Sequence, residues 1–339
     1  MKRNQLREAI FRHLDGLVVV PVAYSLFKKG ILAYLLKEKT STLAQLTNEF
    51  QANEGYLNVA LRVLASQGFL KYEVDNKSGS VTISTLPISE FAFSLVSIYE
   101  DTFQMLTQTS VFTANKMDSD SIALLEPILK KFTENYHIHF EEDENLRTIQ
   151  EQILTHIEGY LVGPIVVNLG MTGMFHKYFM ESSFRADEFH KHPEAFSKIL
   201  DFFVYLGWFS KKNDNYQFTE DGFFFAKRAS AYGVTVSYLP MFKHIDSLLF
   251  GNASELRNIA KNEDEIHVNR EMNVWGSGGA HATYFKVIDD IIIELFNKPI
   301  AEQPKGILDM GCGNGAFLQH IFEVIERQTL RGKMLDDYP

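Results

Sequence analysis

The chain of 339 residues is long enough for two or three domains, each with its own core. Its hydrophobic content of 45% and charged content of 22% are typical of a soluble globular protein. A formal net charge of −10 argues against a nucleic acid recognised through its phosphates. The single cysteine, Cys312, excludes a disulfide framework and is compatible with a reducing compartment, so we expect a cytoplasmic protein.

The apolar stretch Gly16–Phe27 follows a basic start and could be mistaken for a signal peptide. It contains Pro21 and runs on into Lys28, Lys29 and more apolar helical sequence. We therefore interpret it as a core helix and expect no segment that spans a membrane.

An internal repeat relates Ala9–Leu32 to Gln152–Phe175, with each matched pair 143 positions apart and no gap. The identical pairs are His13 and His156, Gly16 and Gly159, Pro21 and Pro164, and Gly30 and Gly173, with Asp15 matching Glu158 conservatively. Such self-similarity indicates two copies of one structural unit.

Both copies continue with the same order of elements. In the first copy, helices are predicted over Ala44–Phe50 and Glu54–Gln67, the latter capped by Asn53, before a hairpin that turns through Asp75–Ser80. In the second copy, a helix with a phenylalanine-rich stripe precedes a hairpin that turns at Asn213–Asn215. Helices followed by a two-stranded wing are the pattern of a winged helix, present twice.

The winged helix is a common DNA-binding unit, but the helices that would enter the major groove carry only Arg62 in one copy and Lys198 in the other. A groove-reading helix needs several cationic and amide side chains. The unit instead resembles the N-terminal dimerisation domain of small-molecule O-methyltransferases. That resemblance implies either a homodimer or an intramolecular pairing of the two repeats.

We divide the chain into four parts by these patterns. Residues 1–100 form the first winged-helix-like repeat and residues 101–148 a helical connector. Residues 149–260 form the second repeat, and residues 261–339 hold a linker and the start of a further domain.

The stretch Gly306–Phe317 reads GILDMGCGNGAF. The apolar pair Ile307 and Leu308 predicts a short strand that ends at Asp309, and a helix is predicted from Ala316. Between them, glycines alternate at three positions, Gly311, Gly313 and Gly315. A strand, a glycine turn and a helix together let a backbone approach a ligand closely, with amide groups free at the helix start.

Two cofactors fit this turn. The dinucleotide fingerprint is matched by Gly311, Gly313 and Ala316, but Asp309 would repel a pyrophosphate and attract the ammonium group of a methionine. The motif D-x-G-x-G-x-G resembles the first motif of class I S-adenosylmethionine (SAM) methyltransferases. This resemblance implies that Asp309, Gly311 and Gly313 line the methionine end of SAM, while Gly315 permits tight packing of helix on strand.

A second glycine-rich stretch, Asn273–His281, precedes a helix predicted over Ala282–Phe296. It is either a capped helix start or part of the cofactor site. In the second interpretation Trp275 and Gly276 form a wall for the cofactor, and His281 is a general base or one ligand of a metal. One histidine does not define a metal site, because at least two more ligands are needed.

The overall order of these parts resembles the methyltransferase modules of bacterial polyketide and related natural-product assembly lines, of the apratoxin type. The resemblance implies a divalent metal and methylation of carbon beside a carbonyl in an acyl group held on a carrier. The acceptor is thus a small molecule or a carrier-bound acyl group, and His281 is the residue we assign to catalysis.

The expected fold is mainly α with small β wings: two winged-helix-like repeats followed by the start of a Rossmann-like α/β methyltransferase domain. A class I methyltransferase sheet needs about seven strands, and after Gly315 the chain holds one predicted helix, Ala316–Arg331, and a tail. We therefore expect a fragment that is inactive and binds SAM poorly unless it is continued or complemented. The rival functions are an adaptor or dimerisation protein built on winged helices, and an NAD-dependent oxidoreductase.

Overall fold

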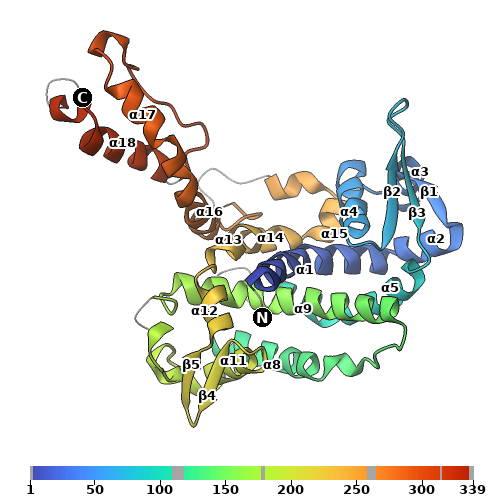
Figure 1. The fold of residues 1–339 in the computed structure, drawn as a ribbon. Helices are drawn as coiled ribbons and strands as arrows, with labels where there is room; N and C mark the ends of the chain where they lie inside the picture. The colour runs from blue at the N-terminus through green and yellow to red at the C-terminus, as the bar shows by residue number, and fades with distance from the viewer. Residues whose placement is uncertain (1–2, 109–117, 177–179, 258–264, 314, 336–339) are drawn as a thin grey trace.

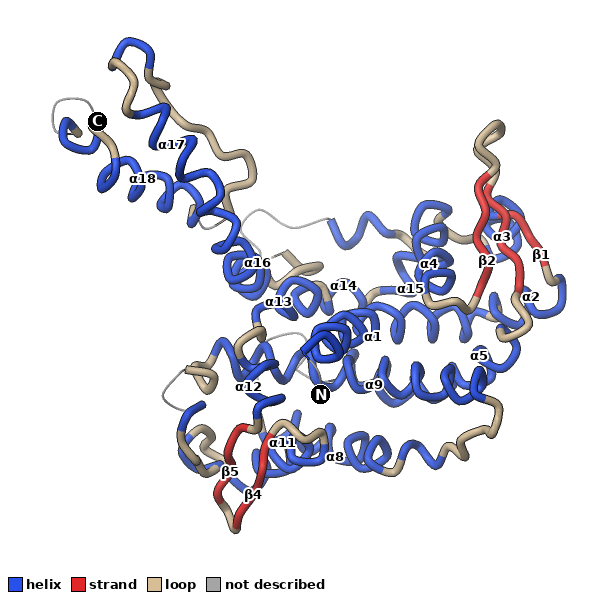
Figure 2. The backbone as a smooth tube through the Cα atoms, viewed as in Figure 1, coloured by secondary structure: helices blue, strands red, loops and turns tan. Residues whose placement is uncertain are grey.

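The computed structural model describes residues 3–108, 118–176, 180–257, 265–313 and 315–335, without the side chains of 279–283. Helices dominate this part of the chain, and the strands form two small sheets (Figures 1 and 2). The helices are α1 (Arg3–Lys29), α2 (Ile31–Glu38), α3 (Leu43–Phe50), α4 (Glu54–Ser66), α5 (Ser89–Leu95), α6 (Glu100–Gln108), α8 (Ser119–Thr133), α9 (Glu144–Met171), α11 (Pro193–Tyr205), α12 (Glu220–Ala226), α13 (Ser230–Ser237), α14 (Leu239–Phe242), α15 (Ile245–Phe250), α16 (Arg270–Phe285), α17 (Asp289–Phe296) and α18 (Ala316–Gln328). The strands are β1 (Thr40–Thr42), β2 (Leu70–Val74), β3 (Val81–Thr85), β4 (Phe209–Lys212) and β5 (Asn215–Phe218).

Both predicted wings are present. In the first, β2 and β3 pair antiparallel and β1 joins the far side of β3, which gives the order β1-β3-β2. In the second, β4 and β5 form an antiparallel pair. The helix before the first wing begins after Asn53, as predicted, but the Asn53 side chain donates to the carbonyls of Leu248 and Gly251 instead of capping α4.

The two long helices that carry the internal repeat, α1 and α9, pack against each other through the centre of the molecule (Figure 1). Both are long and apolar enough to cross a membrane by length and composition. Most of their apolar side chains are buried in the protein's own core, which also takes in the helices and wings around them.

The helices approach so closely at one point that only glycine fits there. A Cβ on Gly16 would lie 2.2 Å from the carbonyl oxygen of His156, and a Cβ on Gly159 would lie 2.3 Å from that of His13. These are the matched pairs of the repeat, so each copy contributes the same glycine and the same histidine to the crossing. The two copies therefore meet about an approximate twofold axis within one chain.

A smaller unit formed by α16, α17 and α18 projects from the rest (Figures 1 and 2). Its α17 and α18 share a separate core built from Ile292, Phe296, Ile321, Val324 and Ile325. Helix α16 connects this unit to the larger body by packing along α13.

Two predicted elements in this unit differ from the structure. The glycine-rich stretch Asn273–His281 lies inside α16, and the helix predicted over Ala282–Phe296 is interrupted by a 3-10 turn at Lys286–Ile288. No strand forms at Ile307 and Leu308, because the described residues offer no neighbouring strand to complete its backbone hydrogen bonds.

Candidate functional site

The glycine turn before α18 adopts the backbone that the motif predicts. Gly311, Gly313 and Gly315 have φ angles of 88°, 56° and 77°, in the left-handed region that other residues rarely enter. Gly315 is the N-cap of α18, and its amide donates to the carbonyl of Cys312. The turn thus leads directly into the positive end of a helix dipole.

The surface around this turn is open. A Cβ on any of the three glycines would meet no atom within 4 Å. Asp309 is half-buried and forms no ion pair or side-chain hydrogen bond with another described residue. Its carboxylate is therefore available to a cationic group.

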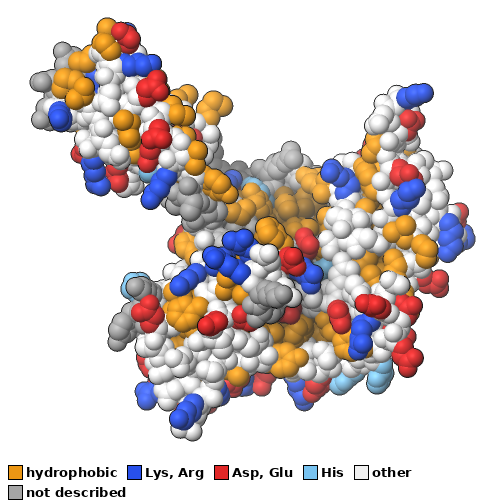
Figure 3. Space-filling view, viewed as in Figure 1, with side chains coloured by type: hydrophobic (Ala, Val, Ile, Leu, Met, Phe, Trp, Pro, Cys, Tyr) orange, Lys and Arg blue, Asp and Glu red, His pale blue; other side chains and the backbone are white. Residues whose placement is uncertain are grey.

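The apolar residues beside the turn are exposed. Leu308 and Met310 are 85% and 88% exposed, and Phe322 on α18 is 52% exposed. A shallow apolar cavity of about 230 Å³ lies next to them, lined by residues that include Gly306, Ile307 and Phe322. The space-filling view shows hydrophobic side chains on the surface of this projecting unit (Figure 3).

The second predicted part of the site lies in a helix crossing. Gly233 of α13 and Gly276 of α16 touch, since a Cβ on Gly276 would lie 2.6 Å from the backbone nitrogen of Val234. The ring of Trp275 packs against Gly170 of α9 and against Gly233. Trp275 and Gly276 therefore join the projecting unit to the larger body, and their assignment to the cofactor stays a prediction. The side chain of His281 lies outside the described residues, so its assignment stays a prediction as well.

An ion pair near the turn was not anticipated from the sequence. Nε2 of His320, on the second turn of α18, lies 2.6 Å from Oδ1 of Asp289 at the start of α17. The rings of Phe285 and Phe317 pack beside it, with centroids 5.0 Å apart. The pair links the helix that follows the glycine turn to the helix before it. In the sequence, this ion pair is indicated only by a histidine on one apolar helix and an acid at the start of another.

The histidines at the α1–α9 crossing have equivalent partners. Nδ1 of His156 lies 2.6 Å from the hydroxyl of Tyr99, and Nδ1 of His13 lies 2.7 Å from that of Tyr232. Burial lowers the pKa of His156 to about 3, so this ring is neutral at physiological pH. We interpret these buried pairs as structural, because their ring nitrogens are occupied by protein partners.

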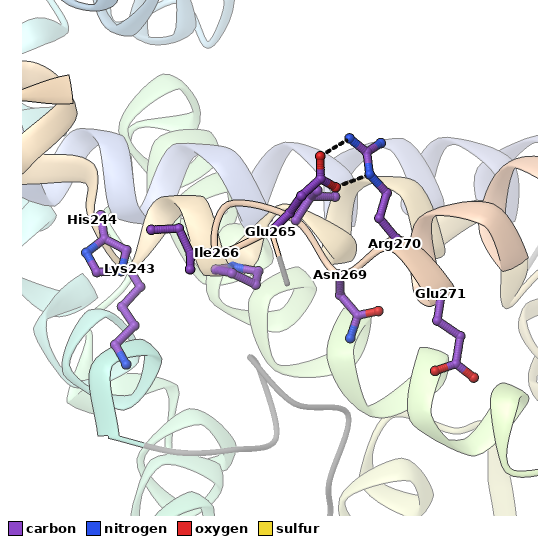
Figure 4. A pocket seen from close by; sticks show the side chains of 9 residues that line it. Lys243, His244, Glu265, Ile266, Asn269, Arg270 and Glu271 are labelled. Carbon is purple, nitrogen blue, oxygen red and sulfur yellow. Dashed lines mark hydrogen bonds and ion pairs between the residues drawn. The ribbon is translucent and has the colours of Figure 1, made fainter. Parts of the chain in front are cut away.

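A cavity of about 550 Å³ lies where α14 and α15 meet the start of α16 (Figure 4). Lys243 and His244 line one side, and the carboxylate of Glu265 binds Arg270 on the other. The glycine turn contributes none of the lining residues. This polar cavity is thus separate from the turn.

The described residues fit one end of SAM. The unpaired carboxylate of Asp309 suits the methionine ammonium, and the left-handed glycines leave room for the methionine backbone. Within the described part of the chain, no group of three or more His, Cys, Asp or Glu side chains is placed to hold a metal ion.

Models of three domain families match consecutive parts of the chain. Residues 6–72 match the AprA N-terminal domain, residues 158–252 the AprA winged helix domain, and residues 265–339 the AprA MT2-like domain. The first match runs from α1 into β2, the second runs from the middle of α9 past β4 and β5 to the end of α15, and the third contains the glycine turn. A search of curated proteins found no match. The chain therefore carries, in this order, an AprA-like N-terminal domain, an AprA-like winged-helix domain and an AprA MT2-like methyltransferase domain.

Proposed function

We propose that the chain takes part in SAM-dependent methyl transfer to a small-molecule or carrier-bound acyl acceptor in natural-product biosynthesis. The observation that carries this proposal is the turn of three left-handed glycines after Asp309, within the segment that matches the MT2-like domain. A turn of this kind fits the methionine end of SAM better than it fits a pyrophosphate, because a carboxylate would repel the latter.

Each part of the turn has a distinct role in this proposal. Asp309 binds the methionine ammonium, and Gly311 and Gly313 let the backbone lie against the methionine chain. SAM supplies an electrophilic methyl group, and the protein's task is to hold that group in line with the acceptor. His281 is the residue proposed to remove or relay the acceptor proton.

The exposed surface beside the turn argues that this chain alone binds SAM weakly. Leu308 and Met310 are almost fully exposed, and apolar side chains at such positions are normally covered by a sheet and its helices. We propose that further polypeptide, on the same chain or another, covers this surface and completes the adenosine site.

Ligand-observed NMR at millimolar concentration tests the proposal, since it detects weak binding. We expect saturation transfer to SAM but not to NAD⁺, with competition by S-adenosylhomocysteine. Asp309→Asn should weaken SAM binding by about tenfold because it removes the carboxylate that holds the ammonium. Asp290→Asn, at an exposed acid on α17, is the matched control. Transfer to NAD⁺ instead of SAM, or equal effects of the two substitutions, would refute the proposal.

One observation favours a second function. The best-packed part of the molecule is the pairing of the two repeats through α1 and α9, which needs no cofactor. An adaptor built on these winged helices would keep its structure and partners without SAM. A chain that binds no SAM under the conditions above, yet folds normally, would support this alternative.

A further inference from the structure

A cluster of positively charged side chains lies on the larger body, at the N-terminal end of α1. Arg3, Arg7 and Phe11 follow one another at spacings of four residues and so share one face of this helix. Both arginines are exposed, and the phenylalanine ring is 68% exposed. Helix α1 packs here against α12 and α13.

Arg228, between α12 and α13, extends this cluster. Its guanidinium stacks 3.8 Å above the ring of Phe224 and donates to that residue's carbonyl oxygen. Burial, together with the positive charges of Arg3 and Arg7, lowers its pKa, so the three cations lie within range of one another. Figure 3 shows Lys and Arg side chains gathered in this region, over the start of α1 and beside α12 and α13.

The cations of this cluster have no carboxylate partner in the described part of the chain. Arg3, Arg7 and Arg228 form no ion pair with any described acid. The first turn of α1 also contains no acidic residue, although acids are the side chains that stabilise a helix N-terminus. A chain with a net charge of −10 thus keeps several like charges together where they repel each other.

We propose that Arg3, Arg7, Phe11 and Arg228 form a docking surface for the acidic helical face of an acyl carrier protein. The arginines would bind its carboxylates, and Phe11 would pack against an apolar side chain between them. The choice of a carrier protein rests on the proposed function, in which the acceptor is a carrier-bound acyl group. Nucleic acid and anionic membrane fit less well, because a small surface with three cations neutralises few of the charges of an extended polyanion.

Binding of holo-acyl carrier protein to the full chain, measured by surface plasmon resonance at low and high salt, tests the proposal. We expect binding that weakens as salt rises, and a loss of at least about tenfold in affinity for the double variant Arg3→Glu and Arg7→Glu. The variant Arg3→Lys and Arg7→Lys should keep most of the affinity, which shows that the charges matter and that the helix still folds.

The matched control is the double variant Arg62→Glu and Lys77→Glu. It changes the net charge equally, at exposed cations on α4 and in the first wing that have no described ion-pair partner. Equal losses for the two glutamate variants, or no carrier binding by the unmodified chain, would overturn the proposal. So would binding to phosphatidylglycerol vesicles with none to the carrier protein. Titration of the same samples with SAM separates this failure from a failure of the proposed function.

Discussion

Gly16 and Gly159 occupy equivalent places in the two repeats, and each lies against the backbone of the other copy's histidine. Neither has a positive φ angle, so the requirement for glycine comes from close approach and not from backbone conformation. The histidines beside them are held by buried tyrosines, which fixes the rings at the crossing. Two glycines, two histidines and two tyrosines thus lie together where the copies cross.

Gly16→Ala is expected to lower the free energy of unfolding by about 3 kcal/mol, because its Cβ would force the backbones of α1 and α9 apart. Gly55→Ala is the control, since Gly55 lies in α4 with no atom within 4 Å of an added Cβ. That substitution should leave stability unchanged or raise it by about 0.5 kcal/mol. Denaturant unfolding of both variants is the measurement, and equal midpoints would show that the crossing is not as close as described.

The sequence predicts that the histidines and glycines of the two repeats are equivalent, but it does not predict that their tyrosine partners are. His13 and His156 are found because the two long helices match without a gap. Tyr99 and Tyr232 are 133 positions apart, not 143, because the intervening segments differ in length. A comparison in one fixed register therefore misses them, although they make the same contact in each copy.

Helix α16 shows where local preference and packing disagree. Three glycines within Asn273–His281 favour a loop by helix propensity. The structure keeps them helical, since Gly276 lies against Gly233 and bulkier residues could not approach α13 as closely. Packing against another helix cannot be read from a single stretch of sequence, so the predicted helix start at Ala282 lies after the observed start at Arg270.

Gly276→Ala should loosen the joint between α16 and α13, because the added Cβ would lie 2.6 Å from the backbone of Val234. Hydrogen exchange is expected to become faster in α16 and to stay slow in α1 and α9. Gly278→Ala provides the control two residues along the same helix, where an added Cβ would meet nothing within 4 Å. If both substitutions gave the same exchange pattern, the glycine contact would not be what joins the two units.

The predicted strand at Ile307 and Leu308 does not form, because a strand, like α16, depends on contact with another element. The apolar pair and the glycine turn are local signals, and the turn forms as predicted. A strand also requires a neighbour to pair with, and the described residues supply none. Local sequence can thus predict the turn and the helix after it, whereas the sheet depends on residues elsewhere.

For the molecule as a whole, the two repeats and the projecting unit differ in how completely they are packed. The repeats bury their apolar helices against each other, with the wings on the outside. The projecting unit has a small core of its own and exposes Leu308, Met310 and Phe322 beside the glycine turn. The part that matches the MT2-like domain therefore exposes apolar side chains around its proposed site.

Photochemical cross-linking of SAM to the chain, followed by peptide mapping, is the most direct test of the proposed SAM site. Our account predicts that millimolar SAM labels a peptide within Gly306–Phe317, and that excess S-adenosylhomocysteine prevents the labelling. Labelling confined to another region, such as the cavity lined by Lys243 and His244, would contradict the assignment of Asp309 and the glycines to the methionine end of SAM.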